Sequence, residues 1–334
     1  MKALVLKKYS KSAPLIEFCD VAKPKIKPHE MLVQVYAVGL NPIDNMIPSG
    51  MFKPVLKFQL PATLGSDLAG VVTEVGSQVK RFKPGDEIFA SIFDRGIGSL
   101  AEFAVVPENT AALKPANLNF VQAASIPMVG LTSWQALQEV ANIQPGQKVF
   151  IPAGSGGIGS FAIQLAKHFG ANVSTTTSTR NLEWVKGLGA DKVIDYTKED
   201  FQRTLQAYDM VLGTTRGDAI EQALGILKPG GKVVSLVGPL DAAFAEKRGL
   251  NFLLKFVFGL MSRKVIGLAK QRSVHYSFLF VRPDAVQLME VGKLLEAERI
   301  KPVIDRVFSF DQAKDALAYL AQGRAKGKVV VEII

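Results

Sequence analysis

The stretch Lys148–Gly170, KVFIPAGSGGIGSFAIQLAKHFG, decides how the rest of the chain is interpreted. It begins with the apolar run Val149–Ile151, which is long enough for a buried strand. The glycine-rich segment Gly154–Gly159 follows and matches the pattern G-x-G-x-x-G. Apolar residues then recur at helical spacing as far as Gly170, which can end the helix. Strand, glycine turn and helix in this order are the context that a dinucleotide-binding fingerprint requires.

Each glycine of the pattern has a physical role. Gly154 permits the tight turn, Gly156 lets a pyrophosphate approach the backbone, and Gly159 lets helix and strand pack closely. The phosphates would bind free N–H groups at the helix N-terminus. A purely structural glycine turn is the alternative, because 29 glycines among 334 residues make the bare pattern weak. The cofactor contacts expected in this turn are Gly154, Ser155, Gly156, Gly157 and Ile158.

The composition is that of a globular protein with room for two domains. The chain has 334 residues, of which 48% are hydrophobic and 21% charged. Cys19 is the only cysteine, so no intrachain disulfide can form, and a reducing compartment is indicated. The first ten residues, MKALVLKKYS, lack the apolar core of a signal peptide, and we expect a cytoplasmic protein.

The chain is basic, with a net charge of +10 at pH 7 and a pI near 9.5. The positive residues are scattered and form no aromatic-interleaved motif, so no specific nucleic acid partner is expected. The most apolar later stretch, Gly249–Met261, is too short to span a bilayer and contains Lys255, so no transmembrane segment is expected. We interpret it as a loop or helix over a binding cleft, with a membrane-surface contact as the alternative.

The chain changes character near residue 124. Residues 1–123 contain short strands with turn signals about every ten residues, as in a barrel-like domain. Strands and helices alternate from residue 124 onward, which predicts a doubly wound parallel sheet. The strands expected in that sheet are Val149–Ile151, Asn172–Ser178, Lys192–Tyr196, Tyr208–Gly213, Lys232–Gly238 and Lys264–Ala269.

The segment after the second of these strands distinguishes between the two nicotinamide cofactors. An NAD site usually has Asp or Glu about 20 residues beyond the first glycines, where it binds the ribose 2′-hydroxyl. This chain has Thr176–Arg180, TTSTR, which offers hydroxyls and an arginine but no carboxylate. Neutral donors and a planar cation suit a 2′-phosphate. The sequence therefore favours NADP(H); the alternative is that Arg180 is only an exposed residue at a helix start.

Several further motifs agree in order and spacing with those of a known family. They are Val38–Asp44, Leu64–Val72, Phe82–Glu87, Gly130–Trp134, Ala153–Gly159, Leu188–Asp191, Ile194–Tyr196 and Gly323–Val331. With them the whole chain resembles the zinc-independent quinone oxidoreductases of the medium-chain dehydrogenase/reductase superfamily, including the zeta-crystallin-like and alkenal/enone reductase branches. The resemblance implies an α/β fold. A Rossmann domain would span residues 124–271, and a GroES-like β-barrel catalytic domain would span residues 1–123 and 272–334.

The resemblance also implies that no metal is bound. Zinc-dependent relatives carry a catalytic cysteine near Gly39 and the sequence Gly-His-Glu near residue 65. This chain has Gly65-Ser66-Asp67 there and no cysteine near Gly39. Zinc-assisted alcohol dehydrogenation is therefore disfavoured.

The resemblance further assigns roles to individual residues. Asn41 and Asp44 would lie in the substrate-cleft loop, and Thr132 near the nicotinamide; these are the expected catalytic residues. A loop cap is the alternative for Asp44, and an exposed strand lysine is the alternative for Lys328. The other expected cofactor contacts are Ser178, Arg180 and Tyr196 at the 2′-phosphate, Gly213 and Thr214 by the adenosine, Val237 and Gly238 at the nicotinamide, and Lys328 on the tail strand.

The implied function is reduction of a quinone or an α,β-unsaturated carbonyl by hydride from NADPH. Related enone reductases often have Tyr or Lys just after the Asn-Pro-x-Asp segment, whereas this chain has Asn45 and Met46, so no proton donor is assigned. The alternatives are a 2-enoyl thioester reductase and a non-catalytic NADPH-binding protein, as among crystallin-like or membrane-associated relatives. A homodimer is also expected, with Val265–Leu268 pairing at a sheet edge.

Overall fold

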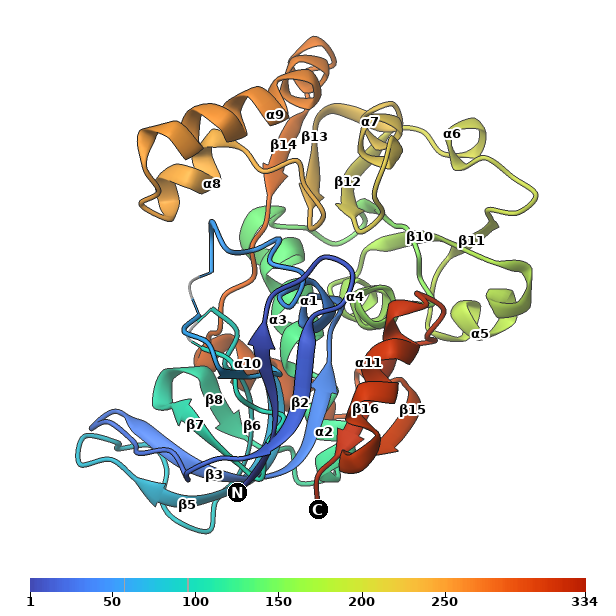
Figure 1. The fold of residues 1–334 in the computed structure, drawn as a ribbon. Helices are drawn as coiled ribbons and strands as arrows, with labels where there is room; N and C mark the ends of the chain where they lie inside the picture. The colour runs from blue at the N-terminus through green and yellow to red at the C-terminus, as the bar shows by residue number, and fades with distance from the viewer. Residues whose placement is uncertain (57, 95) are drawn as a thin grey trace. The chain divides into compact units, whose positions relative to one another are not determined.

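The computed structural model describes residues 1–56, 58–94 and 96–334. Contacts divide the chain into two compact units, and Figure 1 follows the chain through both by colour. The first unit is Met1–Leu131 with Arg282–Ile334, and the second is Thr132–Val281. The boundaries predicted from the sequence, after residues 123 and 271, lie about eight and ten residues before those of the two units.

The second unit is built on a six-stranded sheet in which every neighbouring pair is parallel. The strands lie in the order β11-β10-β9-β12-β13-β14. Counted from the first strand of the unit, this order is 3-2-1-4-5-6, which is characteristic of dinucleotide-binding domains. It confirms the predicted doubly wound sheet. The bounds are β9 (Lys148–Ile151), β10 (Asn172–Thr177), β11 (Lys192–Asp195), β12 (Tyr208–Gly213), β13 (Leu227–Ser235) and β14 (His275–Phe278).

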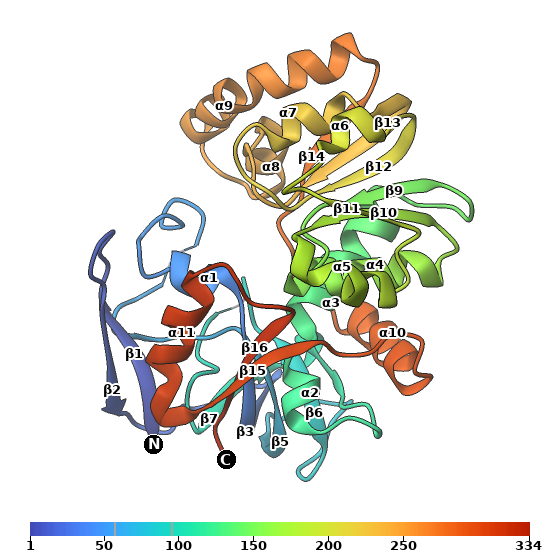
Figure 2. The ribbon, with the colours of Figure 1, turned by 90° about the vertical axis from the view of Figure 1, so that its right-hand side faces the viewer.

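Helices pack along this sheet. Helices α4 and α5 lie against β10 and β11, whereas α7 and α9 lie against β13 and β14 (Figure 2). Val149, Phe150 and Ile151 of β9 are all buried, as expected for a parallel strand covered on both faces. The bounds are α3 (Pro127–Trp134), a π-helix (Gln135–Val140), α4 (Gly157–His168), a 3-10 turn (Thr179–Asn181), α5 (Leu182–Gly187), α6 (Phe201–Thr204), α7 (Ala219–Leu224), α8 (Ala242–Lys247) and α9 (Phe252–Gln271).

One predicted strand is wrong. Lys264–Ala269, the expected sixth strand, lies inside the 20-residue helix α9. A short apolar run suits a strand and a buried helix face equally well. Here Val265 and Ala269, one helical turn apart, are buried together. The sixth strand is β14, so the expected pairing of Val265–Leu268 at a sheet edge is wrong as well.

The first unit contains two sheets. The larger has the order β15-β16-β3-β5-β6-β8, with β7 also paired to β3, and the smaller has the order β2-β1-β4. Every pair is antiparallel except β15 with β16, so this unit is the β-rich domain that the sequence predicts. The bounds are β1 (Lys2–Lys8), β2 (Leu15–Asp20), β3 (Glu30–Leu40), β4 (Ala62–Thr63), β5 (Asp67–Val75), β6 (Glu87–Ser91), β7 (Phe103–Pro107), β8 (Ala111–Leu113), β15 (Ile304–Ser309) and β16 (Lys328–Glu332).

The C-terminal segment returns to this unit and completes it. Figure 1 shows red β16 beside blue β3, with which it pairs through Val329 opposite Leu40. Because Leu40 ends β3, the first residue of β16, Lys328, comes next to the loop that follows β3. The remaining bounds are α1 (Pro42–Met46), α2 (Phe120–Ala124), α10 (Ala285–Glu296), α11 (Ala313–Ala321) and 3-10 turns at Glu108–Thr110 and Phe310–Gln312.

Candidate functional site

The glycine turn between β9 and α4 has the geometry that its sequence predicts. A Cβ on Gly154 would lie 2.2 Å from Thr175 Oγ1, and a Cβ on Gly159 would lie 2.3 Å from Ala153 O. Neither position tolerates a side chain. Gly156, the N-cap of α4, is different, because a Cβ there would come no closer than 3.4 Å to any atom. The first and third glycines therefore allow close packing, and the second leaves an open side where a phosphate can approach.

Neighbouring strands hold this turn in place. Gly154 N donates a hydrogen bond to Thr176 O on β10 (2.9 Å). The hydroxyl of Thr214, just after β12, donates to Pro152 O (2.9 Å). The first N–H groups of α4 have no acceptor within the helix and can bind an anion. The expected contacts Ser155, Gly157 and Ile158 lie at this N-terminus.

The three residues expected around a 2′-phosphate lie on one edge of the sheet. Strands β10 and β11 end level with each other, with Thr177 opposite Asp195. Ser178 and Tyr196 follow directly, and Tyr196 N donates to Thr177 O (3.1 Å). Arg180 is exposed on the following 3-10 turn, and Tyr196 is 61% exposed. This edge therefore presents a guanidinium and a phenol to solvent beside the half-buried hydroxyl of Ser178.

Asp195 is a carboxylate on this edge to which the sequence analysis assigns no role. Its Oδ2 accepts a hydrogen bond from the Thr179 hydroxyl (2.5 Å), and its Oδ1 accepts one from the Thr197 hydroxyl (2.7 Å). These hydrogen bonds lower the pKa of Asp195. The ionised carboxylate therefore ties the turn that carries Arg180 to the end of β11. The motif Ile194–Tyr196 contained this residue but gave no sign of its bonding.

The other expected cofactor residues also lie at strand ends or beside them. Gly213 ends β12, and a Cβ there would lie 2.4 Å from Ile220 Cδ1. Val237 and Gly238 follow β13, and the Ser235 hydroxyl donates to Gly238 O (2.8 Å). Thr132 is buried on α3. The residues that follow β9 to β13 thus lie beyond the carboxyl ends of parallel strands, where such sheets bind ligands.

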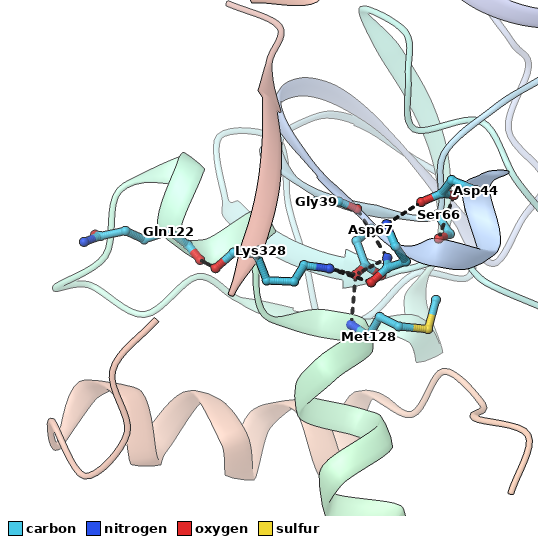
Figure 3. A network of polar contacts seen from close by, with 9 residues as sticks. Gly39, Asp44, Ser66, Asp67, Gln122, Met128 and Lys328 are labelled. Atoms are coloured by element: carbon cyan, nitrogen blue, oxygen red, sulfur yellow. Dashed lines mark hydrogen bonds and ion pairs between the residues drawn. The ribbon is translucent and has the colours of Figure 1, made fainter. Parts of the chain in front are cut away.

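The first unit holds a group of buried polar residues that includes three of the expected site residues, and we call it the buried polar cluster (Figure 3). It consists of Asn41, Asp44, Ser66, Asp67 and Lys328, each at most 5% exposed. Asn41 is the N-cap of α1, and Asp44 accepts a hydrogen bond from Asn41 N (2.7 Å) to close a capping box. Asp67 begins β5, and Lys328 begins β16. Three elements that are distant in sequence thus meet at one buried point.

Asn41 is the centre of this cluster. Lys328 Nζ donates to Asn41 Oδ1 (2.5 Å) and lies 3.9 Å from Asp67 Oδ2. Asn41 Nδ2 donates to Asp67 Oδ2 (2.9 Å) and to Gly39 O (3.3 Å). Met128 N also donates to Asp67 Oδ2 (3.0 Å). The Asn41 amide is therefore fixed in one orientation by its partners.

The cluster places two carboxylates beside one ammonium group. Burial raises the pKa of Asp44 to about 7; the Asn41 N–H opposes this shift, and the charge of Asp67 adds to it. Burial also raises the pKa of Asp67, against the attraction of Lys328. Burial lowers the pKa of Lys328, against the attraction of both carboxylates. We interpret Lys328 and Asp67 as the ionised pair and Asp44 as the group that exchanges a proton near neutral pH.

The structure adds to the sequence analysis at three positions in this cluster. Asp44 serves as a helix cap, the alternative interpretation of that residue. Lys328, expected near the cofactor, contacts Asn41 and is not an exposed strand lysine. Asp67 lies in a motif that the resemblance quoted, but its pairing with Lys328 spans most of the chain and leaves no local signal.

Two kinds of feature, a metal-binding group and a membrane-spanning helix, are absent from the part of the chain that the structure describes. Residues 1–56, 58–94 and 96–334 contain no group of three or more His, Cys, Asp or Glu side chains that could hold a metal ion. The same residues include no helix of the length and apolar character needed to cross a bilayer.

Comparisons with known families match both parts of the chain. Residues 27–116 match the alcohol dehydrogenase GroES-like domain. Residues 188–331 match the family described as zinc-binding dehydrogenase.

Full-length relatives are similar over the whole chain. The zebrafish (Danio rerio) mitochondrial NAD(P)H oxidoreductase RTN4IP1 is 36% identical, over 100% of this chain and 92% of the relative. The chloroplastic NADPH-dependent alkenal/one oxidoreductase of Arabidopsis thaliana is 36% identical, over 99% of this chain and 79% of the relative. The solved structure of a quinone oxidoreductase from Coxiella burnetii superimposes with a TM-score of 0.85 at 32% identity, covering 100% of this chain and 99% of that one.

Proposed function

Because the chain belongs to the quinone oxidoreductase branch of the medium-chain dehydrogenase/reductase superfamily, we propose that it is a zinc-independent, NADPH-dependent reductase of quinones or α,β-unsaturated carbonyls. The observation that carries the proposal is the sheet edge formed by Ser178, Arg180 and Tyr196 beside an open glycine turn. The relatives named as NAD(P)H and NADPH-dependent oxidoreductases support it.

The second unit would hold the cofactor along the carboxyl edge of its sheet. The N–H groups of Gly157 and Ile158 would bind the pyrophosphate over the open side of Gly156, whose own N–H donates to Ala153 O (3.0 Å). Ser178 with Arg180 would bind the 2′-phosphate. NADPH bound there would supply a hydride to an electron-poor carbon of the acceptor. The electron pair released in the acceptor would move to its oxygen, and a proton from water or from an unassigned donor would complete the reduction. Asp195 would act as a positioning residue by fixing the turn that carries Arg180.

We also propose that Asn41, Asp44 and Thr132 act near the reacting groups. The hydrogen bonds of the buried polar cluster favour a positioning role for Asp44 and Lys328, because both contact Asn41 and are themselves shielded from solvent. Because Asn41 Nδ2 already donates to Asp67 and Gly39, a contact with the nicotinamide ribose would have to be made by Asn41 Oδ1 as an acceptor.

Parallel assays of NADPH oxidation with an ortho-quinone and a linear enone test this proposal. The expected result is turnover of at least one acceptor, with NADPH strongly preferred over NADH. Measurable NADPH binding without turnover of either acceptor would contradict it. That outcome would favour a 2-enoyl thioester reductase or a non-catalytic NADPH-binding protein, which assays with an enoyl thioester would separate.

The 2′-phosphate assignment has its own test. The variant Arg180→Gln should raise KM for NADPH about 10- to 100-fold, because it removes a charge-assisted hydrogen bond of about 1.5–3 kcal/mol. KM for NADH should stay unchanged. Arg203→Gln, which removes another exposed arginine of the same unit, is the matched control. Equal effects of Arg180→Gln on both cofactors would refute the assignment.

A cytoplasmic location and a homodimer are also part of the proposal. Two of the relatives carry mitochondrial and chloroplastic in their names, so fractionation of cells is the appropriate test of location. Size-exclusion chromatography with light scattering tests the dimer, and a monomeric mass would contradict it.

A further inference from the structure

Helix α9 presents two faces of unlike character. Its buried side consists of Phe258, Ser262, Val265 and Ala269. The opposite side is apolar over the first half of the helix and open to solvent. Phe252 is 86% exposed and Phe256 is 64% exposed. Leu253, Leu260 and Met261 extend the same exposed face, each more than half exposed. Burying such side chains away from water is favourable, so this face is suited to a partner.

Positive charge is concentrated around the same face. Residues 242–272 contain seven lysines and arginines and a single carboxylate, Glu246. More than half of the chain's net charge of +10 therefore lies in α8, α9 and their flanks, although the charge looks scattered along the whole sequence. Lys255 is paired with Glu246 (2.8 Å), and Lys264 with Glu221 (2.7 Å). Helix α9 itself contains no Asp or Glu.

We propose that α9 docks the protein on the surface of an anionic phospholipid bilayer. Its apolar first half would enter the boundary between headgroups and acyl chains, and Arg263, Lys270 and Arg272 would attract the anionic headgroups. Figures 1 and 2 show α9 at the outer edge of the second unit, with α8 beside it. This inference goes beyond the proposed reductase activity and does not depend on it.

The charge of the surface favours a bilayer over a second copy of the chain. A two-fold interface would bring the same face of each copy together, so the cations of one α9 would meet those of the other. Anionic headgroups complement the same cations and also accommodate the apolar residues between them. Spanning the bilayer is not required, because α9 lies parallel to the surface in this arrangement.

Co-sedimentation with vesicles tests the proposal. The purified full-length protein is mixed with phosphatidylcholine vesicles with or without about 30 mol% phosphatidylglycerol, at about 0.1 M salt. One variant, Phe256→Gln/Leu260→Gln, removes apolar contacts, and another, Arg263→Gln/Lys270→Gln, removes charge. The matched controls are Val286→Gln, an exposed apolar residue on α10, and Lys8→Gln/Lys11→Gln, two exposed lysines of the first unit. Circular dichroism checks that every variant is folded.

The expected result is binding to the anionic vesicles only, weakened by added salt. Each α9 variant should lower the partition coefficient about tenfold or more. The charge variant loses two cations, each of which contributes about 1 kcal/mol near such a surface. The apolar variant loses two side chains that would be buried among the acyl chains. The two controls should bind like the natural sequence. No binding to anionic vesicles would overturn the proposal, as would binding that Phe256→Gln/Leu260→Gln leaves unchanged. A dimer that this variant dissociates, without vesicle binding, would show that a second copy covers α9.

Discussion

Replacing Asp44 by Asn should remove a loss of folding stability that the natural sequence undergoes as the pH rises. Asp44 is 1% exposed and lies beside a second buried carboxylate, Asp67. An asparagine preserves both hydrogen bonds of the side chain. Its carbonyl oxygen can accept from Asn41 N, and its amide can donate to Ser66 Oγ, the two partners of the carboxylate. The variant therefore changes charge with little change of shape.

The magnitude follows from the pKa of this carboxyl group. Its pKa is about 7 in the folded protein, compared with about 3.9 for an unperturbed Asp. The folded state thus holds a proton that the unfolded state has lost, and stability falls as pH rises through this window. A difference of about three units corresponds to about 4 kcal/mol as an upper limit. Because Asp67 and Lys328 titrate with Asp44, we expect the free energy of unfolding to change by about 2–4 kcal/mol across the whole window between the two pKa values.

Urea unfolding of the natural sequence and of Asp44→Asn at pH 5 and pH 8 measures this difference. Between pH 5 and the folded-state pKa of about 7, only about two of the three units are sampled. The stability advantage of the variant over the natural sequence should therefore be about 1.5–2.5 kcal/mol larger at pH 8 than at pH 5. Asp311→Asn, which removes an exposed carboxylate paired with Lys2, controls for loss of an aspartate. A ΔΔG of unfolding for Asp44→Asn that is the same at both pH values would contradict the raised pKa of Asp44.

Two further predictions concern stability. Lys328→Met should destabilise the protein by about 3–5 kcal/mol in urea unfolding, because it leaves Asp67 as an uncompensated buried charge. The double variant Lys328→Met/Asp67→Asn should be more stable than Lys328→Met alone. If the stability losses of the two single variants simply add, the ion pair between Lys328 and Asp67 is contradicted. Gly159→Ala should lower stability by about 1–3 kcal/mol and weaken NADPH binding, since its Cβ would overlap Ala153 O. Gly187→Ala, where a Cβ would meet nothing within 4 Å, should be neutral or slightly stabilising in the same measurement.

Local pattern predicts much of this fold. The strand, turn and helix around Gly154 follow from apolar runs and glycine spacing, and the parallel sheet follows from the alternation of strands and helices. The same pattern gives a wrong prediction at Lys264–Ala269, which lies in helix α9. That apolar run is too short for its hydrophobic periodicity to distinguish a strand from a helix. The exposure of Phe252 and Phe256 on that helix also depends on the packing of the unit, and it has no signature in the run of apolar letters.

The candidate site is predicted only in part, for a similar reason. The hydroxyls and arginine after β10 follow from position in the sequence. The contact of Lys328 with Asn41 requires β16 to pair with β3, which no local pattern encodes. The raised pKa of Asp44 requires both complete burial and the neighbouring Asp67, and these are properties of the folded chain.

Transfer of deuterium tests the proposed reaction most directly. NADPH carrying deuterium at C4 of the nicotinamide, on the transferred face, is incubated with the protein and a linear enone, and the product is examined by NMR. We expect one deuterium per product molecule at the carbon β to the carbonyl and a solvent-derived hydrogen at the α carbon. NADPH oxidation that leaves no deuterium in the reduced enone would contradict hydride transfer to that acceptor.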